Sequence, residues 1–197
     1  MKKNVLFSCV MILIATLFIS VMPTDAEGAV YEDTVRLHIL ANSDTEEDQA
    51  LKLKIRDAVL KEYGGALFSS DSAEAARDTL EGLLVEIESF CEAEVRKLGY
   101  SYNVSVSLGE EWYDTREYED FTLPKGVYTS LRIFIGEGDG QNWWCVMFPP
   151  LCLDVATEKA PADDAIGKYS DEEVTLISKK GYNVKFKLLE LISGAFS

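Results

Sequence analysis

The sequence has few of the side chains that build metal sites and nucleophilic sites. Its 197 residues include one histidine, His38, and four cysteines. Zinc sites need cysteine and histidine ligands at short, regular spacings, and the chain has no such set. The glycines at 136, 138 and 140 alternate, but two tryptophans follow where a phosphate-binding loop needs a helix. We therefore expect no metal ion and no cofactor.

Basic residues are the second shortage, because 19 Lys and Arg stand against 34 Asp and Glu, for a net charge of −15. Binding to phosphates needs a basic protein surface, and so does binding to anionic lipid headgroups. The counts therefore exclude nucleic acid as a partner and favour a well-solvated acidic protein. No low-complexity tract or Pro/Gly-rich linker divides the chain, so we expect a single secreted domain over residues 30–197.

The N-terminus carries the longest apolar run. Lys2 and Lys3 precede a stretch from Val5 to Met22, which is followed by small residues at the positions that a signal peptidase reads. This pattern predicts a signal peptide over residues 1–26, cleaved near Ala26. A stretch of about 18 residues also reaches the lower limit for a membrane-spanning helix, so an uncleaved anchor is the alternative.

Export would allow a disulfide bond to form. Cys9 lies within the signal segment, and Cys91 lies in the centre of an apolar helical stripe, where we expect a buried thiol. Cys145 and Cys152 then remain for each other if the compartment is oxidising. A fully extended chain would separate them by ~23 Å, so the bond requires the chain to reverse at Pro149-Pro150.

The periodicities predict an α+β fold. Residues 34–41 suit a strand, and Ser43 with Glu46 has the capping-box spacing of a helix that ends near Tyr63 at Gly64-Gly65. A second helix should run from Asp71 or Ser72 to Gly99. Later elements are strands over 100–108, 113–123, 127–135 and from 142, then a short helix from Ser170 to Lys180.

The short turns around Gly126 and Gly140 indicate an antiparallel meander. We therefore predict a mostly antiparallel sheet with two main helices packed on one side, and the place of the first strand stays open. The acidic residues between Glu110 and Asp120 lack the ordered pattern of a calcium loop. They suit a solvated edge that discourages strand-to-strand aggregation, or a surface that complements a basic receptor loop.

Three segments together resemble the stage II sporulation protein R family. Residues 35–44 (VRLHILANSD) and 48–57 (DQALKLKIRD) resemble the opening of that family, and residues 142–152 (NWWCVMFPPLC) resemble its second signature. The segment Leu131-Arg132-Ile133 with Gly136 leads into the second signature as it does in the family. The similarity spans roughly residues 31–153, and both signatures are long and unusual in composition.

The resemblance implies a signalling protein of endospore formation. Family members are made in the forespore and exported into the space between the forespore and mother-cell membranes. There they trigger a membrane-embedded aspartic protease of the mother cell, which removes the inhibitory leader of pro-sigma-E. The resemblance thus implies a protein that acts by contact, is not an enzyme, and has no small-molecule substrate.

Candidate contact residues are inferred from the pattern of apolar side chains. Adjacent tryptophans in a strand point to opposite faces, so one should enter the core and the other is packed or exposed. An exposed tryptophan beside the constrained bend would be a good docking anchor. On the first helix, two leucines lie opposite the main apolar side and are either buried or contact a partner. The candidates are Trp143, Trp144, Phe148, Leu53 and Leu60.

A secreted hydrolase is the competing class of protein. His38 with Ser43 or Cys145 could be drawn as a base with its nucleophile. Ser43 has the position of a helix cap, however, and Cys145 in an oxidised pair cannot be a nucleophile. A His38→Gln variant separates the two classes, because an enzyme would lose turnover whereas a ligand need only keep its fold.

Overall fold

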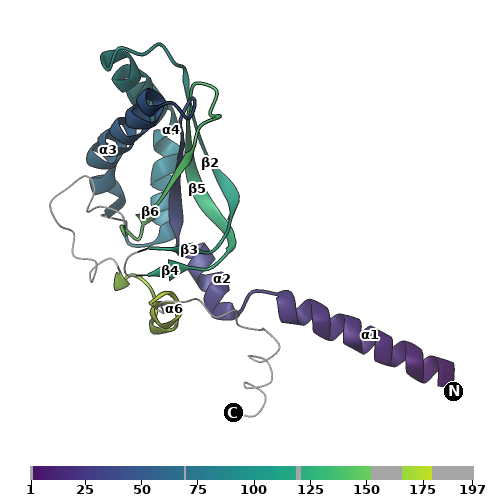
Figure 1. The fold of residues 1–197 in the computed structure, drawn as a ribbon. Helices are drawn as coiled ribbons and strands as arrows, with labels where there is room; N and C mark the ends of the chain where they lie inside the picture. Colours follow the sequence, from purple (N-terminus) through teal and green to yellow (C-terminus); the bar gives the residue numbers. More distant parts are fainter. Residues whose placement is uncertain (1, 69, 119–120, 152–165, 179–197) are drawn as a thin grey trace.

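The structure is a computed structural model that describes residues 2–68, 70–118, 121–151 and 166–178 (Figure 1). The predicted mixture of helices and strands is confirmed. In chain order the elements are α1 (Lys2–Val21), α2 (Asp25–Glu32), β1 (Val35–Leu40), α3 (Glu46–Phe68), α4 (Ala73–Lys97), β2 (Val104–Tyr113), β3 (Arg116–Glu117), β4 (Thr122–Leu123), β5 (Gly126–Ile135), β6 (Asn142–Phe148) and α6 (Asp171–Ile177).

The main sheet has the strand order β2-β5-β1-β6. The pairs β2–β5 and β1–β6 are antiparallel and the pair β1–β5 is parallel, so the predicted mostly antiparallel sheet is confirmed. The predicted meander is wrong, because β1 lies between β5 and β6. The side chains of β1 explain its place: Leu37 and Ile39 on one face and Arg36 and His38 on the other are all buried. A strand buried on both faces belongs in the middle of a sheet.

The larger apolar core lies between the sheet and helices α3 and α4. The two helices contact each other and the sheet, and Figure 1 shows them on the same side of it. Alternate residues of the strands point into this core because side chains in a strand change face at every residue. The buried members include Leu51, Ile55 and Val59 of α3, Leu80, Ile87, Cys91 and Val95 of α4, and Leu37, Ile39, Leu131 and Ile133 of the sheet.

A smaller core lies on the other face of the sheet, at one end. It is formed by α2, the short β3–β4 hairpin and α6 with the strands beneath them, and includes Val30, Phe121, Leu123, Tyr128, Tyr169, Leu176 and Ile177. The predicted strand over 113–123 is therefore replaced by the end of β2 and a two-stranded hairpin. The rest of this face carries no helix in the described part of the chain (Figure 1).

The predicted N-terminal cap is confirmed for α4 and α6 and is wrong for α3. Ser72 caps α4 and Ser170 caps α6 with the predicted capping box, although α6 ends at Ile177. The predicted cap of α3 is wrong, since the Thr45 hydroxyl, rather than Ser43, accepts from the backbone N–H of Asp48 at 3.3 Å.

The predicted end of α3 at Gly64-Gly65 is also wrong, because the helix continues to Phe68. A glycine inside a helix costs only about 1 kcal/mol relative to alanine. Tyr63, just before the pair, is buried, and its ring packs edge-on against Phe90 of α4 with the centroids 5.5 Å apart. Packing against α4 therefore outweighs the weak helix propensity of the two glycines.

The N-terminal helix α1 projects from the body of the protein (Figure 1). Its window Lys3–Ser20 has a mean hydropathy of 2.0 and none of it is buried, so it is long and apolar enough to cross a membrane. Only a short connection separates α1 from α2, which is capped by the buried Thr24. The predicted cleavage position near Ala26 lies in the first turn of α2.

Candidate functional site

The part of the sheet that no helix covers in the described ranges presents a surface that we call the open face. Residues on the face opposite α3 and α4 follow from the strand register: His38 lies beside Arg132 on β5 and beside Trp144 on β6. The next row toward the sheet end pairs Leu40 with Phe134 and with Asn142. We define the open face as His38, Leu40, Arg132, Phe134, Asn142 and Trp144, together with Glu111 and Arg116, which reach over it.

His38 is the centre of a hydrogen-bond network on the open face. The residue is only 6% exposed. Its Nδ1 lies 2.8 Å from Glu111 Oε1, and its Nε2 lies 2.9 Å from Asn142 Oδ1. Both partner atoms are hydrogen-bond acceptors. The two contacts fix the position of the imidazole and join β1 to β2 and β6.

Glu111 is held in turn by Tyr113. The Tyr113 hydroxyl donates to Glu111 Oε2 at 2.7 Å and hydrogen-bonds with Ser130 Oγ at 2.7 Å. Burial, followed by the hydrogen bond to Glu111, raises the pKa of Tyr113 well above its ordinary value. The hydroxyl therefore remains protonated, and Glu111 keeps its orientation toward His38.

Trp144 contacts both His38 and Arg116 through its ring. The His38 ring lies 5.5 Å from it between centroids, at an interplanar angle of 27°. The guanidinium carbon of Arg116 lies 3.7 Å from the centroid of the Trp144 ring, in the range of a cation–π contact. Trp144 stays half-buried, so one part of a rigidly held indole remains available to solvent.

Arg36 lies on the same face of β1 as His38, on the side nearer the smaller core, and is fully buried. Its guanidinium carbon lies 3.7 Å from the centroid of the Tyr113 ring, and its Nη2 donates to the Tyr118 hydroxyl at 3.0 Å. Among the described residues it forms no ion pair with a carboxylate. Aromatic rings thus carry the stabilisation that an acidic partner usually provides.

The hydrolase hypothesis finds no assembled constellation in the described part of the chain. Cys145 pairs in register with Leu37, so its side chain lies on the face opposite His38. The Ser43 hydroxyl donates to Asp48 Oδ2 at 2.6 Å, at the start of α3. Burial alone would raise the pKa of Asp48, but hydrogen bonds from Ser43 and Asn42 outweigh it and lower that pKa. Ser43 therefore belongs to a helix-start network.

The candidate contact residues fall into two groups. Trp143 and Trp144 lie on opposite faces of β6, as strand alternation predicts, and Trp143 packs beneath Arg56, whose guanidinium carbon is 4.8 Å from its centroid. Leu53 is 39% exposed on α3. Phe148 and Leu60 are buried members of the larger core. Cys152 lies outside the described residues, so its bond to the buried Cys145 stays a prediction.

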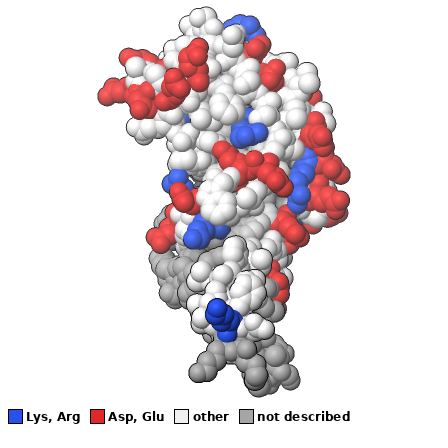
Figure 2. Space-filling view, turned by 90° about the vertical axis from the view of Figure 1, so that its right-hand side faces the viewer, with Lys and Arg blue, Asp and Glu red and all other residues white. Residues whose placement is uncertain are grey.

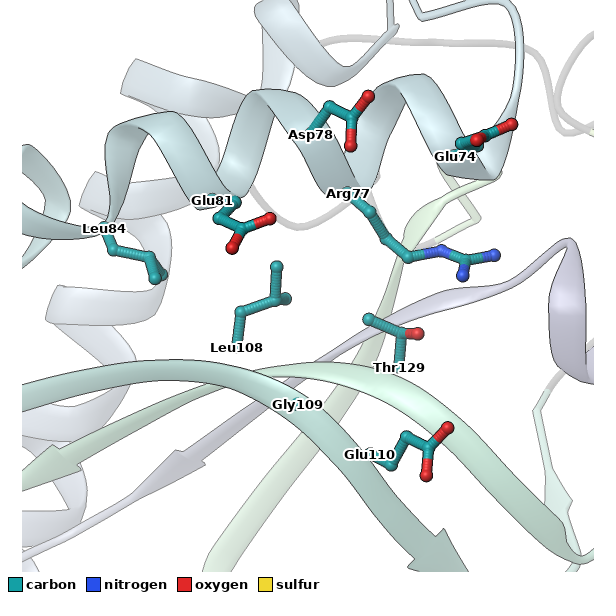
Figure 3. A pocket seen from close by; sticks show the side chains of 9 residues that line it. All are labelled: Glu74, Arg77, Asp78, Glu81, Leu84, Leu108, Gly109, Glu110 and Thr129. Atoms are coloured by element: carbon teal, nitrogen blue, oxygen red, sulfur yellow. The ribbon is translucent and has the colours of Figure 1, made fainter.

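A concave feature, which we call the α4 groove, lies on the helix side of the sheet (Figure 3). Its volume is about 390 Å³. Figure 3 shows Arg77 reaching from α4 toward the strands while the acidic side chains of α4 and β2 line the opening. The lining residues are Glu74, Arg77, Asp78, Glu81, Leu84, Leu108, Gly109, Glu110 and Thr129.

Together these features define a class of protein: a small α+β domain behind an apolar N-terminal helix, with a rigid aromatic surface. Residues 31–158 match the family model described as Stage II sporulation protein R (spore_II_R). Stage II sporulation protein R of Bacillus subtilis (strain 168) is 37% identical over 185 residues, which cover 84% of this chain and 83% of that protein. The chain therefore belongs to the stage II sporulation protein R family, as its two signatures predicted. No solved structure matches it.

Proposed function

We propose that the protein is an exported signal of endospore formation that activates a membrane-embedded aspartic protease of the mother cell by direct contact. Activation then leads to the processing of pro-sigma-E. Membership of the family over residues 31–158 supports the role in sporulation. The observation that carries the contact mode is the open face, where a hydrogen-bond network and a cation–π contact hold Trp144 in a fixed, half-exposed position.

The N-terminal helix supports a place outside the cytosol. The window Lys3–Ser20 is apolar and none of it is buried, as expected for a segment that enters a membrane as a signal or an anchor. The body that follows is acidic, with a net charge of −15 for the whole chain. We place this body in the space between the forespore and mother-cell membranes.

Contact through the open face fits the general physics of interfaces. Tryptophan and arginine are the commonest side chains among residues that dominate binding energy, and both occur here in direct contact. Because Arg116 and His38 already fix the indole of Trp144, little side-chain entropy remains to be lost when a partner binds. Leu53 and the exposed part of Trp143 extend the candidate surface to the side of α3, whereas Phe148 and Leu60 support it from the core.

We also propose that Cys145 and Cys152 form a disulfide bond in this oxidising compartment. Cys145 is buried in the middle of β6, which ends at Phe148 just before Pro149 and Pro150. A loop this short contributes only about 2.5 kcal/mol in the chain-entropy model. The bond would therefore shape the bend beside Phe148 rather than hold the fold together.

The experiment adds the purified full-length chain to membranes that contain the protease and the pro-sigma-E precursor. Release of the leader is measured with the wild type, Trp144→Ala, His38→Gln and Val85→Ala. Val85 is 81% exposed on α4 and serves as the matched control. We expect Trp144→Ala to lose most of the activation and Val85→Ala to keep it.

The same assay separates contact from catalysis. A signalling protein gives no leader release when the protease is omitted, and His38→Gln weakens activation only through the Trp144 surface that His38 positions. Loss of activation in reductant, reproduced by Cys145→Ser, would assign a role to the disulfide. Cleavage of the precursor by the chain alone, abolished by His38→Gln, would instead support the hydrolase hypothesis.

A further inference from the structure

Apart from the aromatic residues of α1, the most exposed aromatic side chain of the described residues lies outside the open face. Trp112 of β2 is 62% exposed, and its register partner Val127 of β5 is 43% exposed. Both lie on the helix side of the sheet, because Trp112 follows Leu108 and Glu110 on the same face of β2. Helix α4 covers Leu108, whereas nothing among the described residues buries Trp112 or Val127.

This apolar pair continues directly into the α4 groove. Thr129 pairs with Glu110 in the strand register, and both of these residues line the groove. The neighbouring row on the same face is the pair Val127 and Trp112. Leu84 and Leu108 form its apolar floor, and Figure 3 shows the two side chains facing each other. An exposed tryptophan and valine next to an apolar floor form a larger apolar surface than a solvated sheet end requires.

The rim of the groove is strongly acidic. Four of its nine lining residues are carboxylates, and none of these four forms an ion pair in the described part of the chain. Arg77 is the only basic lining residue, and its Nη2 donates to the carbonyl oxygen of Glu32 at 2.6 Å. That hydrogen bond ties Arg77 to the end of α2, so the negative charge of the rim faces solvent largely uncompensated.

We propose that Trp112, Val127 and the α4 groove form a docking site for a basic, partly apolar segment of another protein. Lysine or arginine side chains of the segment would lie against Glu74, Asp78, Glu81 and Glu110, and its apolar side chains against Trp112 and the groove floor. A cation beside Trp112 gains a further cation–π contact. This site lies on the opposite side of the sheet from the open face.

Charge decides between this occupant and the others. An anionic lipid surface would be repelled by the four carboxylates. A second copy of the chain carries the same net charge of −15 and would add like charges to the rim. A metal ion has no set of three ligands placed for it among the described residues. Figure 2 shows the side of the molecule on which β2 and β5 lie, where acidic side chains outnumber basic ones.

The test uses the full-length chain in phosphatidylcholine nanodiscs, which accommodate α1. The probe is a synthetic peptide of repeating Lys-Val-Lys-Ser, compared with the same sequence carrying glutamate in place of lysine. Titration calorimetry at low and high salt gives the Kd, with empty nanodiscs as the blank. We expect the lysine peptide to bind, more weakly at high salt, and the glutamate peptide to show no binding.

Variants assign the binding to the groove. Trp112→Ala should weaken it about tenfold or more, as for a central aromatic anchor. The double variant Glu81→Gln, Glu110→Gln should weaken it several-fold and flatten its salt dependence. The controls Val85→Ala and Glu137→Gln, both at exposed positions elsewhere, should leave the Kd within about twofold.

Three results would overturn the proposal. Equal losses in the control and groove variants would mean that the peptide senses only the overall charge. Equal binding of the glutamate peptide would exclude charge recognition. Binding to vesicles containing phosphatidylglycerol that Trp112→Ala abolishes would assign Trp112 to a bilayer. Because the probe is a peptide, none of these outcomes depends on whether the open face activates the protease.

Discussion

Replacement of Thr24 by alanine tests whether α2 is an integral part of the folded domain. The buried Thr24 side chain accepts from the backbone N–H of Glu27 at 3.3 Å, and the Thr24 backbone N–H donates to Glu27 Oε2 at 2.6 Å. Loss of such a cap costs about 1 kcal/mol, within a range of roughly 0.5–2 kcal/mol. Helix α2 contacts both α6 and β5, so its loosening should be transmitted to the smaller core.

The assay is urea unfolding of the full-length chain, followed by tryptophan fluorescence. We expect Thr24→Ala to lower the free energy of unfolding by about 1 kcal/mol. Thr175→Ala is the control, because Thr175 is exposed in α6 and its hydroxyl only donates to the carbonyl oxygen of Asp171. An unchanged midpoint for Thr24→Ala, equal to that of Thr175→Ala, would refute the reasoning.

The same argument applies to cleavage of the predicted signal peptide. A cut after Ala26 would remove Thr24 and leave a charged amino group at the start of α2, where the helix dipole disfavours positive charge. We expect a chain that begins at Glu27 to be less stable than one that begins at Thr24 by at least the cost of the cap, about 1 kcal/mol. Mass measurement of the exported protein then shows which of the two ends, or the intact anchor, occurs in cells.

Two further predictions concern pH and glycine. Burial, followed by Glu88 and Glu94, raises the pKa of the Cys91 thiol from 9.0 to about 12. Between pH 9 and 12 only the unfolded chain loses this proton, so the free energy of unfolding should fall by about 1.4 kcal/mol per pH unit in that range. Urea unfolding of Cys91→Ala at the same pH values should lack this decrease. Gly82 has open space around it in α4, so Gly82→Ala should raise the free energy of unfolding by roughly 0.5–1 kcal/mol. Gly136→Ala should lower it by about 1 kcal/mol or more, because its φ of +63° and the Asn42 side chain oppose a Cβ; equal midpoints of the two variants would contradict both.

Local patterns predicted the elements that depend on neighbours in sequence. The stripe of α4 and the caps Ser72 and Ser170 involve residues three or four positions apart, so they could be recognised without knowledge of the fold. The place of β1 between β5 and β6 could not, because strand pairing joins segments about a hundred residues apart. The continuation of α3 past Gly64-Gly65 likewise depends on packing against α4.

The candidate sites show the same division. That Trp143 and Trp144 point to opposite faces follows from strand alternation alone. The contact of His38 with Glu111 joins residues 73 positions apart and had no signal in the sequence. Trp112 was missed because it lies in an acidic run that indicates a solvated edge, and only the register shows it beside Val127 and the α4 groove.

Photo-crosslinking from the open face tests the central claim of signalling by contact most directly. A crosslinking amino acid replaces Glu117, the exposed neighbour of Arg116 on β3, and in a second variant it replaces Val85 on α4. Both variants are irradiated on membranes that contain the protease. We predict a covalent adduct with the protease from position 117 and none from position 85. Full activation with no adduct from position 117, or with equal adducts from both positions, would contradict contact through the open face.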